Sequence, residues 1–285
     1  MTVSTYFQPA SVPEALALLG EHGPDLLVIA GGTVAMPLIN EGISLPRLVM
    51  GLRRTGLDGI EHTDDTLRIG AMTTLTTLAD QEDSPLLATA ARRTASWAVR
   101  NMATVGGNLF TPPPGGDVAT ALLALDAQVE LTGVHGGRTI PIEAFWTGFL
   151  GTALGADELV TGITVRLGAG DEHRDTFLKF GRKAANTPAV VTVAAHVTVE
   201  GGTVREARIA LGAVGPHPVR ARAAEAALAG QPLTAETIAT AAAAATDDTD
   251  PFTDAVATDW YRRRMVRVIV ERALTGLAAQ AGRDA

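Results

Sequence analysis

The sequence predicts an α/β or α+β protein that ends in a smaller α+β unit. Two observations lead to this prediction. Up to about residue 166, short apolar runs bounded by Gly or Pro alternate with stretches of helical periodicity. Beyond residue 175, three strand-like runs are followed by three helix-like ones, which is typical of a small sheet covered by helices. The 285 residues are enough for roughly two compact units of ~150 residues each.

The first helix and the first strand are predicted from their boundaries. Ser11 is a typical N-cap residue, and Pro13 is followed by apolar positions at helical spacing. Residues 25–30 form a nearly all-apolar run between breakers, which is typical of a strand buried on both faces. Gly31 and Gly32 follow at once, so we expect a glycine turn at the end of this strand.

The other elements of the first unit follow from periodicity and turn residues. Helices are predicted over 34–39, 73–80, 85–91 and 118–125, and strands over 47–50, 67–70, 128–131 and 158–166. Asp117 stands at the N-terminal boundary of the last of these helices. The polar segment 168–175 is the candidate domain boundary.

The C-terminal unit is predicted as a sheet of three strands with three helices. The strands are expected over 176–180, 190–199 and 205–212, and the helices over 221–229, 235–245 and 259–277. Gly201 and Gly202 predict the hairpin turn between the second and third strands. The basic residues Arg262, Arg263, Arg264 and Arg267 of the last helix are expected on a solvated face.

Composition argues against several classes of function. The chain has 31 acidic and 23 basic residues, a net charge of −8 and no long basic block, which argues against a nucleic-acid partner. It has no cysteine, so a disulfide, a thiolate nucleophile or a Cys-held iron–sulfur cluster is excluded, and redox chemistry would need an organic cofactor. No apolar run approaches the ~18 residues of a membrane helix, and the first residues do not form a signal peptide, so a cytoplasmic protein is expected.

Two glycine pairs are the candidate binding elements. Gly31-Gly32 follows a buried strand, where backbone conformations closed to other residues allow several N–H groups to converge on one anion. The pair Gly106-Gly107 follows Thr104. Either pair alone predicts no more than a tight turn, but two pairs flanked by threonines could hold one pyrophosphate from both sides. A Rossmann fingerprint is disfavoured, because a third glycine and an acidic residue ~20 positions on are both missing.

These pairs belong to an ordered set of motifs that resembles the FAD-binding medium subunit of the molybdenum hydroxylases, the family of xanthine dehydrogenase and aerobic carbon monoxide dehydrogenase. The resemblance spans essentially the whole chain. The motifs are Ala30-Gly31-Gly32-Thr33, Ile69-Gly70-Ala71-Met72-Thr73-Thr74, Arg100-Asn101-Met102-Ala103-Thr104-Val105-Gly106-Gly107-Asn108, Asp117, Phe149, Gly151, Leu154, Asp157-Glu158-Leu159-Val160, Phe177-Leu178-Lys179-Phe180-Gly181-Arg182-Lys183, Tyr261-Arg262-Arg263 and Glu271-Arg272-Ala273-Leu274.

The resemblance implies a fold and a function. Residues 1–170 would form a two-lobed FAD-binding region of the vanillyl-alcohol oxidase and p-cresol methylhydroxylase type, with lobes of about 1–53 and 54–170, and residues 171–285 the family's C-terminal domain. The chain would be an oxidoreductase subunit that passes electrons from an iron–sulfur partner through non-covalent FAD to a terminal acceptor. An iron–sulfur small subunit and a molybdopterin large subunit are the expected partners, in a heterotrimer that can dimerise.

The resemblance also implies which residues hold FAD. The pyrophosphate would be wrapped by the backbone donors of Ile29, Ala30, Gly31, Gly32, Thr33, Val34 and Ala35. The second lobe would close on it with Ala103, Thr104, Gly107, Asn108 and Thr111. Asp117 would lie on the ribitol or ribose side, with Leu159 and Val160 as apolar walls. Lys179 would lie close to the flavin ring and tune its potential; without the resemblance, a solvated surface lysine is expected there.

Four departures from the family pattern leave alternatives open. Val34 stands where a polar or acidic side chain is common, Pro112 and Pro113 remove two N–H donors, and Lys183 replaces the second arginine of a frequent pair. These changes leave open a stand-alone FAD-dependent oxidase or dehydrogenase that acts on a small organic substrate. A scaffold that has lost FAD is a third possibility.

Other catalytic chemistries have little support in the sequence. The six histidines show no metal-ligand spacing, so no metal site is predicted. Ser96, His62 and Asp64 contain the residue types of a hydrolytic triad, but no nucleophile elbow accompanies them. The substrate of the complex and the terminal acceptor are not encoded in any motif of this chain.

Overall fold

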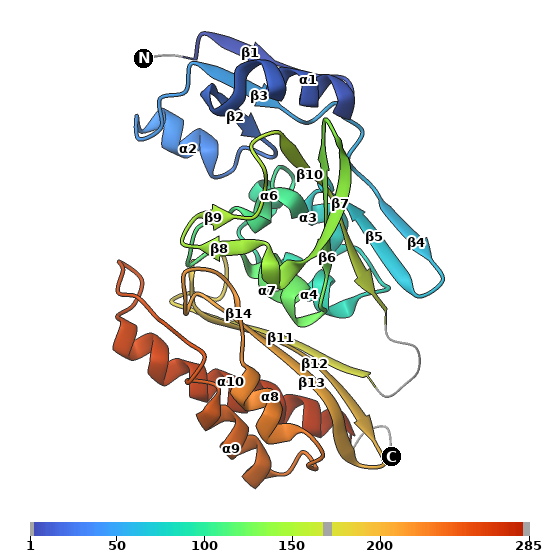
Figure 1. Cartoon of the computed structure of the whole chain (residues 1–285). Coiled ribbons are helices and arrows are strands. Elements are labelled where there is room, and N and C mark those ends of the chain that lie inside the picture. Colours follow the sequence, from blue (N-terminus) through green and yellow to red (C-terminus); the bar gives the residue numbers. More distant parts are fainter. Residues whose placement is uncertain (1–2, 168–172, 282–285) are drawn as a thin grey trace.

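The computed structural model describes residues 3–167 and 173–281, which form three parts that follow one another from top to bottom in Figure 1. The first part is a small parallel sheet with two helices. The second is a five-stranded antiparallel sheet with five helices. The third is a four-stranded sheet with three helices. The predicted boundary between residues 170 and 171 lies outside the described residues, so the division into domains stays a prediction.

The first part is built on three short parallel strands in the order β1-β3-β2, which are Thr5–Phe7, Leu48–Gly51 and Leu26–Ile29. Helix α1 (Val12–His22) begins where predicted, because the Ser11 side chain accepts a hydrogen bond from the Glu14 N–H. Its buried Leu16 and Leu19 pack on Leu26 and Met50 of the sheet. A 3-10 turn (Gly23–Asp25) leads into β2, and helix α2 (Ala35–Asn40) follows the glycine turn.

The second part has a five-stranded antiparallel sheet in the order β4-β5-β10-β6-β7. The strands are Ile60–Thr63, Thr66–Gly70, Glu158–Arg166, Gln128–Gly133 and Gly136–Pro141. The helices are α3 (Leu75–Ala79), α4 (Pro85–Arg93), α5 (Trp97–Arg100), α6 (Val105–Leu109) and α7 (Asp117–Ala124). A 3-10 turn (Ile142–Ala144) and the short strands β8 (Trp146–Gly148) and β9 (Gly151–Thr152) complete it.

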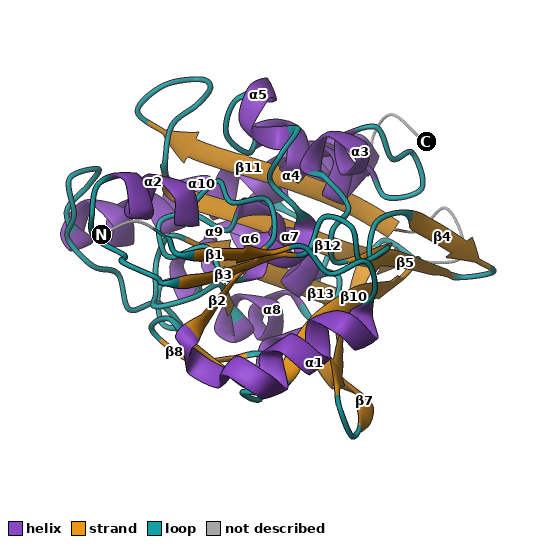
Figure 2. Cartoon of the chain, turned by 90° about the horizontal axis from the view of Figure 1, so that it is seen from above, coloured by secondary structure: helices purple, strands orange, loops and turns teal. Residues whose placement is uncertain are grey.

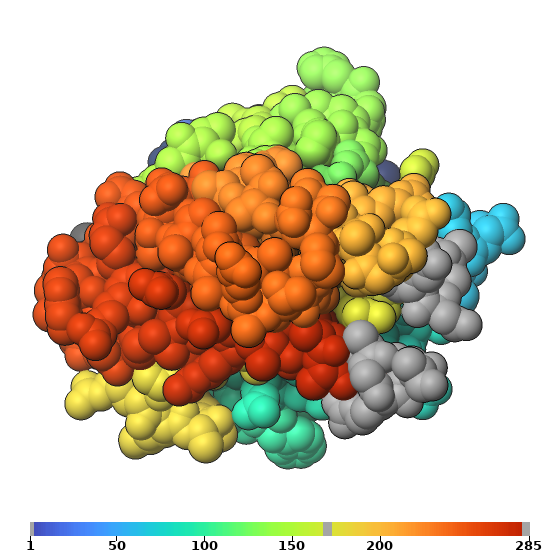
Figure 3. Space-filling model, turned by 90° about the horizontal axis from the view of Figure 1, so that it is seen from below, coloured from blue at the N-terminus to red at the C-terminus, as the bar shows by residue number. Residues whose placement is uncertain are grey.

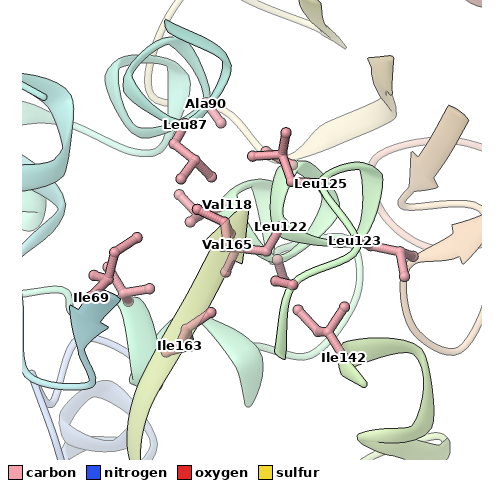
Figure 4. Packing of buried hydrophobic residues seen from close by; sticks show 14 of the residues in the cluster. Ile69, Leu87, Ala90, Val118, Leu122, Leu123, Leu125, Ile142, Ile163 and Val165 are labelled. Atoms are coloured by element: carbon pink, nitrogen blue, oxygen red, sulfur yellow. The ribbon is translucent and has the colours of Figure 1, made fainter. Parts of the chain in front are cut away.

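The core of this second part continues into the C-terminal sheet. Figure 4 shows Val118 and Leu122 of α7 among Leu87 of α4 and Ile163 of β10. All eight residues of α7 are buried, because the helix also packs against β12 (Ala189–Glu200) and β13 (Thr203–Gly212). Phe177, Ala194 and Ala210 of the C-terminal sheet belong to the same apolar cluster. Helix α7 therefore lies between two sheets.

The C-terminal sheet is covered on both faces. Its order is β11-β12-β13-β14, with β11 at His173–Gly181 and β14 at Val219–Arg220. Helices α8 (Arg222–Leu228), α9 (Ala235–Ala244) and α10 (Asp259–Ala281) cover the face opposite α7, and Figure 3 shows them in orange and red across the underside. This explains why residues 189–198 of β12 are all buried.

The elements differ from the sequence prediction where polar or very short segments are involved. Strands β4 and β7 were not predicted, because most of their residues are exposed and show no apolar alternation. The two-residue β14 makes the C-terminal sheet four-stranded, where three strands were predicted. The second glycine pair lies inside helix α6 and not in a turn.

One charged residue contradicts its prediction outright. Arg262 was expected on a solvated face of the last helix, but its side chain is fully buried. Its guanidinium donates to the carbonyl oxygens of Ala189, Val190 and Ala213 and to the carboxylate of Asp254. The neighbouring Arg263, Arg264 and Arg267 are exposed, as predicted.

A membrane-crossing helix is not found in the part of the chain that the structure describes, because none of its long helices is sufficiently apolar.

Candidate functional site

A cavity of about 710 Å³ lies where the three parts of the chain meet, and all sixteen predicted cofactor-binding residues line it. The first part contributes residues 29–35, the second contributes residues around α6, the start of α7 and strand β10, and the C-terminal sheet contributes Lys179. Its volume is in the range of small-molecule and cofactor sites, about 300–1,000 Å³. The structure brings the predicted residues together, while their role as ligands stays a prediction.

The glycine turn after β2 offers a row of free hydrogen-bond donors. Within the described residues, none of the five N–H groups from Gly31 to Ala35 donates a hydrogen bond to the protein. Gly32 has a φ of 72°, in the left-handed region that favours glycine. Val34 occupies the N-cap position of α2 and makes no capping bond with its side chain. Successive free N–H groups at such a turn form an anion-binding concavity.

The two lobes touch at the glycines. A Cβ added to Gly31 would lie 1.9 Å from the carbonyl oxygen of Met102 and 3.0 Å from the Cα of Ala103. On the other side, a Cβ on Gly107 would lie 3.5 Å from the Cβ of Ala30. Only a residue without a side chain allows this backbone approach at position 31.

The cavity wall that the second lobe provides at α6 has N–H groups that are already bonded within the protein. The N–H groups of Val105, Gly106 and Asn108 donate to protein carbonyls, and that of Gly107 donates to the Thr104 hydroxyl at 3.1 Å. The Asn108 side-chain oxygen accepts from the N–H of Ala119 at 2.9 Å. This glycine pair therefore shapes the cavity by close packing, whereas the pair after β2 supplies the free donors.

Asp117 and Lys179 form a buried ion pair between the second part and the C-terminal sheet. Lys179 Nζ donates to Asp117 Oδ2 at 2.6 Å, and the two side chains are 9% and 5% exposed. Lys179 Nζ also donates to the carbonyl of Arg93 at 3.3 Å. Lys179 is therefore not the solvated lysine that composition alone would suggest.

The second oxygen of Asp117 is the unsatisfied group of this site. Asp117 Oδ1 is buried and has no hydrogen-bond partner. The nearby Thr94 hydroxyl does not satisfy it, because that hydroxyl donates to the carbonyl of Ala90 at 2.8 Å. Burial raises the pKa of the Asp117 carboxyl above its usual range, and the Lys179 ammonium opposes this. A buried acceptor without a donor fits a ligand that brings a hydroxyl group.

These features fit FAD. The free N–H row suits its pyrophosphate, and the unsatisfied Asp117 oxygen suits a ribitol or ribose hydroxyl. Leu159 and Val160 are 3% and 6% exposed and give the cavity an apolar wall. Within the described residues no group of three His, Cys, Asp or Glu side chains is arranged to hold a metal ion.

Several lining residues have no counterpart in the sequence prediction. They come from the turn between α4 and α5, from α5 itself and from the loop between β11 and β12, and they are Thr94, Ala95, Val99, Asn186, Thr187 and Pro188. Ala95 and Asn186 have φ values of 48° and 47°. Asn tolerates this region better than most residues, so only Asn186 carried a signal that could have been used.

The departures from the family pattern lie mostly outside the cavity lining. Pro112 and Pro113 line a neighbouring cavity of about 40 Å³, and Lys183 is exposed. Val34 does line the main cavity, where its N–H is one of the free donors. Ser96 caps α5 through the N–H of Val99, and His62 lies beside Asp83, so the structure does not assemble the hydrolytic triad.

Comparison with known proteins matches both regions of the chain. Residues 2–165 match the model of the FAD binding domain in molybdopterin dehydrogenase, and residues 175–277 match that of the CO dehydrogenase flavoprotein C-terminal domain. The medium chain of carbon monoxide dehydrogenase from Hydrogenophaga pseudoflava is 34% identical over 96% of this chain and 97% of its own length. Subunit alpha of the 6-hydroxypseudooxynicotine dehydrogenase complex from Paenarthrobacter nicotinovorans is 33% identical over 94% of this chain and 92% of its own length.

Solved structures agree with these relatives. A chain of the Hydrogenophaga pseudoflava carbon monoxide dehydrogenase superposes with a TM-score of 0.93 at 35% identity and covers 98% of both chains. A chain of quinoline 2-oxidoreductase from Pseudomonas putida 86 superposes with a TM-score of 0.91 at 29% identity, over 99% of this chain and 98% of that one.

Proposed function

Because the chain belongs to the FAD-binding medium subunits of the molybdenum hydroxylases, we propose that it passes electrons from an iron–sulfur subunit through non-covalent FAD to a terminal acceptor. The most direct support is that residues 31–35, whose N–H groups have no acceptor among the described residues, line the same cavity as Asp117 with its unsatisfied carboxylate oxygen. Bound FAD supplies the one- and two-electron chemistry that the side chains of this chain lack.

Different residues of the cavity bind different parts of the cofactor. The backbone of Gly31, Gly32 and Thr33 binds the pyrophosphate, and the close-packed α6 wall keeps water from it. Asp117 Oδ1 accepts a hydrogen bond from a sugar hydroxyl. We assign the Lys179 end of the cavity to the flavin ring, because its positive charge offsets the negative charge that reduction adds to the ring.

The partners follow from the same membership. Relatives are described as a medium chain and as a subunit of a complex. We propose an iron–sulfur small subunit and a molybdopterin large subunit as partners, because a chain without cysteine cannot hold a Cys-ligated iron–sulfur cluster and both of its matched regions are those of the flavoprotein subunit.

The identity of the cofactor is tested by releasing the bound ligand from the protein with heat. The purified full chain is expected to show a flavin absorption spectrum and to release FAD, identified by its mass, in about one equivalent. The measurement is repeated on the chain purified with its partner subunits. A colourless protein that also fails to take up added FAD in both preparations would contradict the proposal.

Lys179→Met is expected to lower the midpoint potential of the bound flavin by on the order of 30 mV, or ~1.4 kcal/mol for two electrons. The physical reason is the loss of the cation that stabilises negative charge at that end of the cavity. Spectroelectrochemical titration measures it. Lys183→Met is the matched control, since Lys183 is the only other lysine of the chain and is exposed. Equal potentials in Lys179→Met and the parent chain would refute the assignment.

A further inference from the structure

The cofactor cavity opens beside two segments that contain no acidic residue. Residues 84–116 and 176–199 contain six basic residues, which are Arg92, Arg93, Arg100, Lys179, Arg182 and Lys183. Since the whole chain has a net charge of −8, these six positive charges leave −14 for the other residues. Each of the two segments therefore carries three positive charges in a chain that is acidic as a whole.

Four of the six basic side chains face solvent. Arg92 and Arg93 are exposed in the last turn of α4, and Arg182 and Lys183 are exposed just beyond β11. None of the four forms an ion pair with a described residue. The other two point inward, since Lys179 pairs with Asp117 and Arg100 donates to backbone carbonyls.

The two segments lie side by side at one end of the cavity. Helix α4 packs against β11, and Lys179 Nζ reaches the carbonyl of Arg93. In Figure 2, α5 and the loop that follows β11 both project at the same edge of the molecule. From these segments, Ala95, Val99 and Thr187 line the cavity itself. A molecule that covers this edge would therefore lie next to the cofactor.

Trp97 adds an apolar anchor to this edge. It begins α5, four residues after Arg93, and is 68% exposed. Exposed Trp together with Arg is the residue combination enriched at the energetic centres of protein interfaces. The ring projects from the surface and lines neither of the two cavities described above, which suits a protein face better than a small anion.

We propose that this basic rim, defined as Arg92, Arg93, Trp97, Arg182 and Lys183, is the docking surface for an acidic face of the iron–sulfur subunit. The proposal rests on the proposed function, which places electron transfer at this cavity. Complementary charge raises the rate at which the two subunits meet and fixes their relative orientation. Trp97, once covered by the partner, would then supply affinity. Docking here brings the partner to the cavity end that contains Lys179.

Charge reversal at the rim tests the proposal. Full-length Arg92→Glu/Arg93→Glu is expected to bind the purified iron–sulfur subunit of the complex at least about tenfold more weakly than the parent chain in 50 mM NaCl. Surface plasmon resonance measures the binding. The parent's affinity should fall steeply between 50 and 500 mM NaCl, and the variant's should fall much less. Arg92→Gln/Arg93→Gln removes the two positive charges without placing negative charges at the C-terminus of α4, where they would destabilise the helix. Its affinity should lie between those of the parent chain and of Arg92→Glu/Arg93→Glu.

The matched control reverses two arginines away from the cavity. Arg166 is the last residue of β10 and Arg205 the third residue of β13; both are exposed, and neither lines the cavity. Their reversal gives the same change in net charge. Arg166→Glu/Arg205→Glu is expected to change the affinity by less than about twofold. Trp97→Ala should weaken binding about tenfold and leave the salt dependence unchanged.

The outcomes separate the docking surface from the cofactor function. Parent-like binding of Arg92→Glu/Arg93→Glu, or equal weakening in the Arg166→Glu/Arg205→Glu control, would overturn the basic rim as the docking surface. FAD content is measured on every sample. Loss of binding with full FAD content supports the rim, and absence of FAD from the parent chain counts against the proposed function while the docking comparison still stands.

Discussion

Gly31→Ala is expected to weaken FAD binding at least about a hundredfold, or ~2.7 kcal/mol. The added Cβ would lie 1.9 Å from the carbonyl oxygen of Met102 and 2.7 Å from its carbonyl carbon. Both atoms belong to the backbone, so no side chain can rotate away. The two lobes must separate at this point, and that displaces the free N–H row from the α6 wall on the other side of the cavity. Equilibrium titration of the apo chain with FAD measures the effect.

Gly20→Ala is the matched control for this substitution. Gly20 lies inside α1, and a Cβ there would meet no atom within 4 Å. Replacing a helix-interior glycine by alanine stabilises a protein by roughly 0.5–1 kcal/mol. We therefore expect unchanged FAD affinity and slightly higher stability in the control. Wild-type affinity in Gly31→Ala would show that the contact between the lobes does not shape the cofactor site.

Arg262→Met is expected to destabilise the fold by about 3–5 kcal/mol, the usual cost of removing one partner of a buried ion pair. The guanidinium is fully buried and donates to the carbonyls of Ala189, Val190 and Ala213 at 3.1, 2.8 and 3.0 Å. It also donates to Asp254 at 2.7 Å. Methionine retains apolar volume but leaves all four acceptors without this donor. Urea-induced unfolding monitored by circular dichroism measures the change.

The controls for Arg262 lie on the same helix. Arg267→Met removes an exposed arginine of α10 and should change stability by less than about 0.5 kcal/mol. Arg262→Lys retains the positive charge but lacks the planar guanidinium with its several N–H donors. Its loss of stability should therefore lie between those of Arg267→Met and Arg262→Met. A loss below about 1 kcal/mol in Arg262→Met would mean that water or backbone movement satisfies the freed carbonyls.

Local sequence signals were sufficient to predict the bounds of elements that have a clear apolar pattern or a clear boundary residue. Strand β10 (Glu158–Arg166) has the predicted bounds, and α7 begins at Asp117, one residue before its prediction. The edge strands β4 and β7 were missed because exposed polar strands obtain their stability from cross-strand hydrogen bonds and show no apolar period. Edge pairing depends on a neighbour and leaves little signal in the strand itself.

In the candidate site, too, residues in local motifs could be predicted, whereas residues positioned by contacts distant in the chain could not. Its glycine pairs could be identified because the motifs occur in family order, and every residue chosen lines the cavity. The turn at Thr94 and Ala95 was missed because its place depends on packing against β11, more than 80 residues away in the chain. The burial of Arg262 was missed for the same reason, since its three carbonyl acceptors lie 49 to 73 residues away.

Helix α7, buried between the five-stranded sheet and the C-terminal sheet, has a consequence for the newly made protein. The strands that cover one side of it, β12 and β13, begin more than 60 residues after the helix ends. At 5–20 residues per second, a ribosome needs roughly 5–20 s to add the ~90 residues from the end of α7 to the end of β13. During that interval the nascent chain exposes an apolar helix that chaperones recognise. Lys179 lies on β11, which pairs with β12, so the cavity is not complete until this sheet has formed, and we expect cofactor loading to come late in the maturation of the subunit.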